Sequence, residues 1–230
     1  MVMAFAGLPA RLQAVRETIA DRQRRAGLTH PVTIIAVTKT HGPDAVLAAA
    51  AAGIQAVGEN RVQEALAKMP EAAAAPVEWH LIGSLQRNKV KQVVGRFALV
   101  HSIDRAELAE EFARRIPSGS RQRALVEVNC GGEAQKAGAL PEALPGLLDS
   151  LAAMPALVVE GLMTMAPFTE DESVQRATFR RLRTLRDEAE QRGHRLPHLS
   201  MGMSGDYAVA VEEGATMVRL GTILFGERAQ

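Results

Sequence analysis

One lysine of this 230-residue chain ends a short apolar segment. The segment, residues 33–39, reads TIIAVTK, follows Pro31 and precedes the turn-forming pair Gly42-Pro43. A short β-branched run between such signals predicts a buried strand. Burial disfavours a charged ammonium group, so Lys39 at the end of that strand would be a usable nucleophile toward an aldehyde. We therefore predict that Lys39 holds an aldehyde cofactor as a Schiff base; a lysine that snorkels to solvent is the alternative.

The other lysines occupy settings that suit this chemistry less well. The chain has 27 Lys and Arg residues, and five of them are lysines. Lys68 closes a predicted helix, Lys89 and Lys91 lie in a polar, basic stretch, and Lys136 lies in a glycine-rich loop. Lys39 is the one lysine that ends an apolar strand, which favours it as the reactive amine.

Glycine and hydroxyl residues follow two later apolar segments. Met203 and Ser204 lie at the end of one predicted strand, and Gly221 and Thr222 follow the last one. Exposed backbone N–H groups with a hydroxyl beside them suit a phosphate group. Ordinary turn chemistry explains one such loop by itself. Two of them together with a strand-end lysine favour a phosphate cup made by Ser204, Gly221 and Thr222, with Met203 as a neighbouring cofactor contact.

Arg219 is a second charged residue in an apolar setting, because it lies inside the apolar run Met217-Val218-Arg219-Leu220. A buried guanidinium without a partner is costly, so a partner is expected. That partner is either a structural carboxylate or the ring nitrogen of a ligand.

These residues need elements that bring them together, and the chain alternates strand and helix patterns throughout. Eight such alternations in 230 residues, with no linker between them, predict one (β/α)8 barrel domain over residues 1–230. An open doubly wound sheet is the alternative, but no predicted strand is followed by G-x-G-x-x-G. The expected strands are 33–39, 54–57, 77–82, 97–101, 124–128, 158–163, 199–203 and 217–220, and the expected helices are 8–26, 44–52, 61–69, 85–94, 105–116, 141–153, 171–192 and 208–213.

A barrel of this kind places its working residues at the C-terminal ends of its strands. Lys39 ends the first predicted strand, Asn60 follows the second, and His80 lies near the end of the third. We expect Asn60 and His80 to line the pocket with Lys39, although a core role for His80 fits the pattern equally well. No spacing of His, Cys, Asp and Glu suggests a metal site.

Composition narrows the range of partners. The formal net charge is +1 and aromatic residues make up 3% of the chain, so no nucleic-acid surface is expected. The single cysteine, Cys130, can form no disulfide within the chain and is typical of a reducing compartment. The sequence contains no apolar run of 18 residues, so no membrane span is expected. We expect a cytoplasmic protein, most simply a monomer.

The motifs resemble those of the pyridoxal phosphate homeostasis protein family, whose members are related to the barrel domain of alanine racemase. The resemblance covers nearly the whole chain in the family's order. It rests on residues 36–40, 58–64, 79–89, 101–105, 161–163, 199–204, 216–222 and 225–226.

The resemblance implies a (β/α)8 barrel that carries pyridoxal 5′-phosphate (PLP) on Lys39, with Arg219 facing the pyridine nitrogen and Ser204, Gly221 and Thr222 holding the phosphate. Arginine always carries its protons, so it leaves the ring nitrogen unprotonated and the cofactor a weak electron sink. We therefore expect a protein that buffers and delivers PLP, with PLP-dependent apo-enzymes as candidate partners and no robust turnover. The alternatives are a small PLP-dependent amino-acid racemase and a barrel lyase that uses Lys39 without a cofactor.

Overall fold

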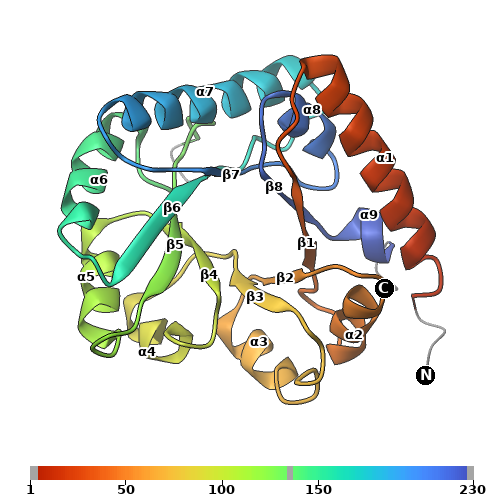
Figure 1. The fold of residues 1–230 in the computed structure, drawn as a ribbon, viewed down its shortest axis with the longest axis horizontal. Coiled ribbons are helices and arrows are strands. Elements are labelled where there is room, and N and C mark those ends of the chain that lie inside the picture. Colours follow the sequence, from red (N-terminus) through yellow and green to blue (C-terminus); the bar gives the residue numbers. More distant parts are fainter. Residues whose placement is uncertain (1–4, 134–136, 227–230) are drawn as a thin grey trace.

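The computed structural model describes residues 5–133 and 137–226, so Lys136 lies outside the described residues. Eight parallel strands form a closed barrel in the order of the sequence, and β8 pairs with β1 to complete it. The helices lie outside this ring (Figure 1). The predicted (β/α)8 barrel is confirmed.

The strands are short and the helices vary in length. The strands are β1 (Thr33–Val37), β2 (Ala56–Glu59), β3 (Glu78–Leu81), β4 (Leu99–Ile103), β5 (Gln122–Glu127), β6 (Leu157–Met163), β7 (His198–Ser200) and β8 (Met217–Leu220). The α-helices are α1 (Leu8–Ala26), α2 (Pro43–Ala51), α3 (Val62–Lys68), α4 (Val90–Val93), α5 (Ala106–Arg115), α6 (Leu144–Ala152), α7 (Glu172–Gln191), α8 (Tyr207–Glu212) and α9 (Thr222–Phe225), with 3-10 turns η1 (Arg87–Lys89) and η2 (Pro141–Ala143).

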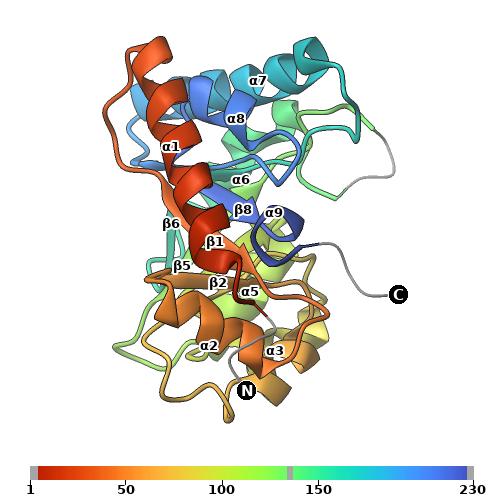
Figure 2. The same cartoon turned by 90° about the vertical axis from the view of Figure 1, so that its right-hand side faces the viewer.

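Helix α1 shows how local sequence sets an element. Leu12, Val15 and Ile19 recur at helical spacing and are buried, while Gly27 ends the helix with a φ of 68°. Glycine reaches this left-handed conformation without steric cost. The helix packs against α8 and α9 beside the joint between β1 and β8 (Figure 2). It therefore covers the closure of the barrel.

The molecule has two apolar layers. The larger lies between the strands and the surrounding helices, and the smaller fills the barrel interior with Ile35, Ala56, Leu99, Leu125, Met163 and Met217. Side chains alternate between the two layers along each strand. Polar side chains above and below the inner cluster therefore belong to opposite ends of the barrel.

Several elements differ from their predicted bounds, and the differences at β1, β2 and the tail bear on the site. β4 lies two residues later than predicted, β7 ends three residues earlier, and the predicted 85–94 helix divides into η1 and α4. β1 ends at Val37, so Lys39 lies in the following turn rather than in the strand. β2 begins at Ala56, two residues later than expected, because Gly53 has a φ of 80° and Ile54 bonds back to the α2 segment through Ala49. The tail also forms α9 directly after Gly221, an element that the sequence did not indicate.

None of the helices in the described ranges combines the length and apolar character that a membrane span requires. Across the same residues, no group of three or more His, Cys, Asp and Glu side chains is arranged to hold a metal ion.

Candidate functional site

Lys39 lies in a tight turn at the C-terminal end of β1. The N–H of His41 donates to the carbonyl of Thr38 at 3.1 Å, and Thr40 has a φ of 69°. A left-handed threonine costs roughly 1–3 kcal/mol and persists where the surroundings hold it, often at functional sites. Lys39 is half-buried and makes no hydrogen bond or ion pair to any residue in the described ranges. Its amine is therefore uncommitted.

A second lysine lies directly beneath this turn. Lys68 is more buried than Lys39, with 7% of its surface exposed, so burial by itself does not single out Lys39. Its Nζ donates to the carbonyl of Thr38 at 2.8 Å and to Oε1 of the buried Glu59 at 2.7 Å. Thr38 Oγ1 donates to the same carboxylate oxygen. The amine of Lys68 is thus engaged, and the pair fixes the backbone that carries Lys39.

Asn60 takes the corresponding place after β2. The N–H of Thr38 donates to the carbonyl of Gly58, which aligns the ends of β1 and β2, so Lys39 and Asn60 follow neighbouring strands at the same end of the barrel. A Cβ atom on Gly83 would lie 2.3 Å from the Asn60 carbonyl oxygen. Glycine at position 83 therefore allows the segment after β3 to approach the segment after β2 closely.

The residues predicted to hold a phosphate lie close together on the side of β1 that pairs with β8. Ser204 Oγ accepts from the N–H of Gly221 at 3.2 Å and from the N–H of Ile223 at 3.3 Å. A Cβ atom on Gly221 would lie 3.6 Å from Val37, and Thr222 is the first residue of α9. Met203 is partly exposed on the same loop as Ser204. Hydroxyl and backbone donors thus converge at one corner, beside the strand that leads to Lys39.

Arg219 points into the barrel and is 4% exposed. Its Nη1 donates to Ser200 Oγ at 2.7 Å and its Nη2 donates to the Thr164 carbonyl at 2.9 Å. Within the described residues it forms no ion pair, so the carboxylate partner considered from the sequence is not present there. Burial lowers the pKa of Arg219 to about 10, while Asp206 and Glu127 raise it, and the group stays protonated at neutral pH.

Glu127 was not among the residues predicted from the sequence. This residue ends β5, is 2% exposed, and its Oε2 has no hydrogen-bond partner in the described part of the chain. Burial raises the pKa of its carboxyl to about 7, Asp104 raises it further, and Arg219 lowers it. A glutamate between valines at the end of an apolar strand was the available signal. A buried carboxyl with an open oxygen on the Arg219 side of the barrel can give or accept a proton there.

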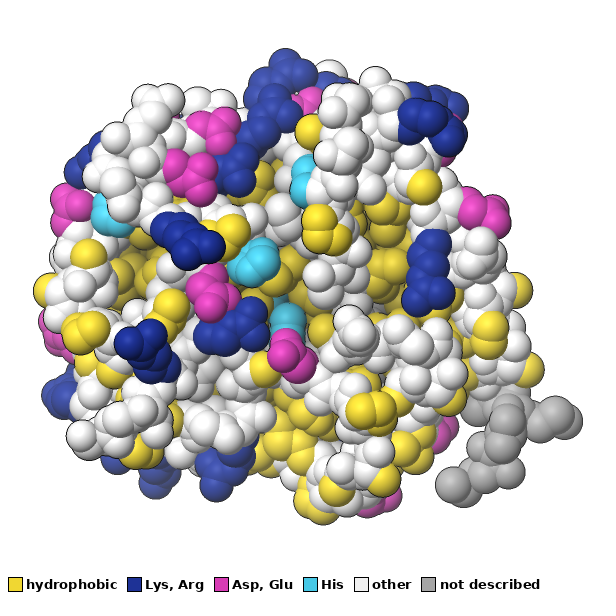
Figure 3. Space-filling model, viewed as in Figure 1, with side chains coloured by type: hydrophobic (Ala, Val, Ile, Leu, Met, Phe, Trp, Pro, Cys, Tyr) yellow, Lys and Arg dark blue, Asp and Glu magenta, His cyan; other side chains and the backbone are white. Residues whose placement is uncertain are grey.

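His80 lies elsewhere than the sequence suggested. Its ring hydrogen-bonds His101 inside the barrel and lines a cavity of about 630 Å³ at the N-terminal ends of the strands. Figure 3 shows this end of the molecule, where histidine, acidic and basic side chains gather around the middle. The remaining predicted residues, Lys39, Asn60, Met203, Ser204, Arg219, Gly221 and Thr222, all lie on the C-terminal half of the barrel.

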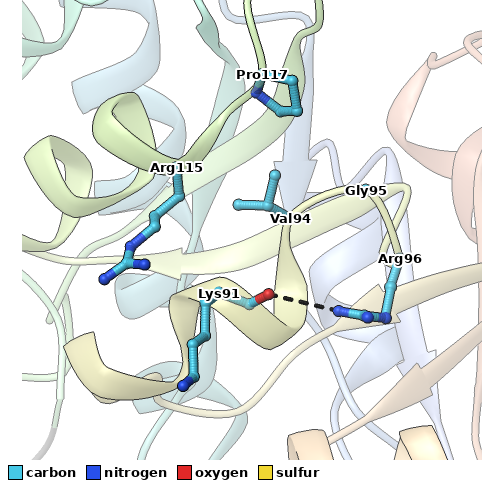
Figure 4. A pocket seen from close by; sticks show the side chains of 6 residues that line it. All are labelled: Lys91, Val94, Gly95, Arg96, Arg115 and Pro117. Atoms are coloured by element: carbon cyan, nitrogen blue, oxygen red, sulfur yellow. Dashed lines mark hydrogen bonds between the residues drawn. The ribbon is translucent and has the colours of Figure 1, made fainter.

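A separate hollow of about 420 Å³ lies on the outer surface between α4 and the end of α5. The side chains of Lys91 and Arg115 extend beside it, while Arg96 folds back and donates Nη1 to the Lys91 carbonyl (Figure 4). Arg115 is held by Glu111 at 2.8 Å. None of the predicted site residues lines this hollow.

Comparison with known proteins places the chain in a family. Residues 10–229 match the family model for the alanine racemase N-terminal domain. The chain is 45% identical over 221 residues to a pyridoxal phosphate homeostasis protein of Aquifex aeolicus, covering 95% of this chain and 97% of that protein. The chain belongs to the pyridoxal phosphate homeostasis protein family. A second member, from Pseudomonas aeruginosa, is 42% identical and is covered over 85% of its length, with 86% of this chain.

Solved structures agree with this family assignment. PipY of Synechococcus elongatus with PLP bound is 39% identical, with a TM-score of 0.80 over 90% of this chain and 100% of that chain. An alanine racemase of Clostridium difficile has a TM-score of 0.72 over 93% of this chain and 57% of that chain, at 14% identity. The racemase likeness shows the shared barrel fold, and the family members supply the closer comparison.

Proposed function

We propose that this chain binds PLP at the C-terminal mouth of its barrel and serves in PLP homeostasis, by buffering and delivering the cofactor. In this proposal Lys39 holds the aldehyde as a Schiff base, and Ser204, Gly221 and Thr222 hold the phosphate. Arg219 faces the pyridine nitrogen, with Asn60 and Met203 at the edge of the site. The PLP-bound structure of PipY, a relative at 39% identity, supports the choice of cofactor.

The observation that carries this proposal is the contrast between two lysines. Lys68 is buried but bonded to two acceptors, whereas the amine of Lys39 is half-buried and bonded to nothing in the described ranges. An amine that is bonded to a carboxylate and a carbonyl is not available to approach an aldehyde, whereas an amine without such partners is available. The residues at the mouth therefore fit a phosphorylated aldehyde.

Arg219 supports the absence of robust turnover. Its guanidinium has carbonyl and hydroxyl partners but no ion pair among the described residues, so it can donate to a ring nitrogen and cannot protonate it. When bound, PLP supplies an electron sink whose strength depends on protonation of that nitrogen. Racemisation also requires a second base on the opposite face, and the single tyrosine of the sequence, Tyr207, is buried at the start of α8.

The test of cofactor attachment is the absorption spectrum of the protein loaded with PLP, before and after borohydride reduction. The wild type should show the near-ultraviolet to visible band of an imine and retain the label after reduction. Lys39→Ala should lose both while keeping its circular dichroism spectrum. Lys91→Ala, at an exposed lysine, is the matched control and should behave as the wild type. A reducible adduct that persists in Lys39→Ala would contradict the assignment.

The test of turnover is incubation of the loaded protein with L-alanine and, separately, with D-alanine. We expect no sustained interconversion, because Arg219 leaves the ring nitrogen unprotonated and the cofactor a weak electron sink. Steady racemisation at ordinary enzyme rates, about 1–10³ per second, would overturn the non-enzymatic role and leave PLP binding intact.

A further inference from the structure

A continuous series of hydrogen bonds crosses the interior of the barrel. Arg219 Nη1 lies 2.7 Å from Ser200 Oγ, and Ser200 Oγ lies 3.0 Å from His101 Nδ1. His101 Nε2 lies 3.1 Å from His80 Nδ1, and His80 Nε2 lies 3.4 Å from Glu78 Oε2. The series joins β8, β7, β4 and β3, which are not all neighbours in the sheet, so it runs through the lumen.

The series runs from the mouth of the barrel to its base. Arg219, Ser200, His101 and His80 are each no more than 4% exposed, whereas the Glu78 side chain is 56% exposed. Glu78 and His80 line the cavity of about 630 Å³ at the N-terminal strand ends. Barrel interiors of this class are normally filled by apolar side chains in layers. A buried polar series beside the inner apolar cluster needs complete hydrogen bonding to be tolerated.

The groups at the two ends of the series fix the direction in which its hydrogen bonds are donated. Arginine only donates hydrogen bonds and an ionised carboxylate only accepts them. A neutral histidine carries one N–H, so one direction satisfies every member. Ser200 accepts from Arg219 and donates to His101 Nδ1, His101 donates through Nε2 to His80 Nδ1, and His80 donates through Nε2 to Glu78. The reverse direction would aim an imidazole lone pair at the carboxylate and leave the buried Ser200 hydrogen without an acceptor among the described residues.

Both histidines must be neutral for this direction to hold. Burial lowers the pKa of His80 to about 4, against the opposing effect of Glu78. Burial, and then the nearby His80 and Arg219, lower the pKa of His101 well below its usual value. The charged and titratable groups facing the series are Glu78 from β3, Arg123 and Glu127 from β5, Glu160 from β6, His198 from β7, and Arg219 and Asp206 at the mouth.

We propose that Ser200, His101 and His80 are positioning residues that hold the Arg219 guanidinium in one orientation. Through this series of hydrogen bonds, the orientation of Arg219 is coupled to the cavity at the base of the barrel. The role of Arg219 toward a cofactor ring rests on the proposed function; the direction of the series does not. Ser200 holds one terminal nitrogen of the guanidinium and the Thr164 carbonyl holds the other. Losing the support behind Ser200 frees the guanidinium to turn.

The first test needs no cofactor. Nitrogen-15 spectra of the histidine side chains in the cofactor-free protein at pH 7 should show His101 and His80 both protonated at Nε2 and bare at Nδ1. The Nη1 and Nη2 signals of Arg219 should be separate, because a guanidinium held at both ends rotates slowly. Protonation at Nδ1 of either histidine overturns the proposal.

The second test breaks the series far from the mouth. His80→Leu removes the acceptor for His101, while His80→Asn places an amide oxygen where Nδ1 lies. His198→Leu, which lines the same cavity without a place in the series, is the matched control. We expect His80→Leu to merge the Nη signals of Arg219 and to speed PLP release about fivefold to tenfold, as expected for one lost buried hydrogen bond. His80→Asn keeps an acceptor for His101, so it should keep the Arg219 signals separate and release PLP within about twofold of the wild-type rate. His198→Leu should change neither the Arg219 signals nor the release rate.

The outcomes separate this proposal from the proposed function. If His80→Leu does not fold, His80→Gln also leaves the Nδ1 position empty and takes its place. Unchanged Arg219 signals in His80→Leu, or in His80→Gln where it is used, overturn the coupling. If His80→Asn merges the Arg219 signals as much as His80→Leu does, His80 acts through packing and not through its hydrogen bond, and the coupling is overturned as well. If PLP does not bind at all, the proposed function fails, and the tautomers and Arg219 signals still decide the positioning role.

Discussion

Replacing Glu127 by Gln should stabilise the protein, and more at high pH than at low pH. The carboxyl is 2% exposed with an unpartnered Oε2, and burial raises its pKa from 4.5 to about 7. The folded protein therefore binds this proton more tightly than the unfolded chain does. The stability from this proton is fully present below pH 4.5 and is lost as the pH rises to about 7. Glutamine resembles the protonated carboxyl and does not ionise.

The size of the effect follows from the difference between the two pKa values. A difference of about 2.5 corresponds to about 3 kcal/mol of unfolding free energy between the limits of low and high pH. Between pH 5 and pH 8 the part that is lost is about 2.5 kcal/mol. Glu127→Gln should thus gain about 2.5 kcal/mol more at pH 8 than at pH 5, relative to the wild type. Titration of groups that do not interact with Glu127 cancels in this difference.

The assay is urea unfolding of the cofactor-free protein, followed by circular dichroism at the two pH values. Removing cofactor avoids the added stability that a bound ligand gives the folded state. Glu110→Gln, at an exposed position of α5, is the control and should show the same change at both pH values. An equal gain from Glu127→Gln at pH 5 and pH 8 would refute the reasoning, because it would mean that Glu127 ionises alike in folded and unfolded chains.

Three further predictions follow from contacts around the mouth. Lys68→Met should lower the unfolding free energy by about 3–5 kcal/mol in urea titrations, since it leaves the fully buried Glu59 carboxylate without its cation; a loss under about 1 kcal/mol would contradict this. Ser204→Ala should weaken PLP binding about tenfold in equilibrium dialysis, because one hydroxyl contact to a charged phosphate is lost, and unchanged binding would remove Ser204 from the cup. Gly83→Ala should lower the unfolding free energy by about 1–3 kcal/mol, since its Cβ would lie 2.3 Å from the Asn60 carbonyl oxygen, and a neutral effect would show that this edge can relax.

The order of elements could be read from the chain because its signals are local. Helix α1 and strand β8 have the predicted bounds, set by an apolar period of 3.6 in one and a short run between Thr216 and Gly221 in the other. Alternation of strands and helices then left a parallel barrel as the main solution, and the barrel was confirmed. Among the strand boundaries that moved, the end of β1 depends on contacts between strands, such as the hydrogen bond from the Thr38 N–H to the Gly58 carbonyl.

The grouping at the mouth was also predictable in outline. Residues that follow parallel strands must meet at one end of a closed sheet, so Lys39, Ser204 and Gly221 were brought to the same end by topology alone. Their detailed environment was not predictable. The strained turn at Thr40 and the uncommitted Lys39 amine depend on Lys68, which reaches Thr38 from a position 30 residues later.

The sequence by itself determined the fold class, the family and the end of the barrel where the lysine lies, because these depend on residue types and their spacing along the chain. Only the tertiary structure decided which buried polar groups meet. Ser200 and His101 are 99 residues apart and touch across the lumen, and His80 faces the base rather than the mouth. The stagger of the strands sets the layer that each inward side chain occupies, and no local pattern in the chain encodes that stagger.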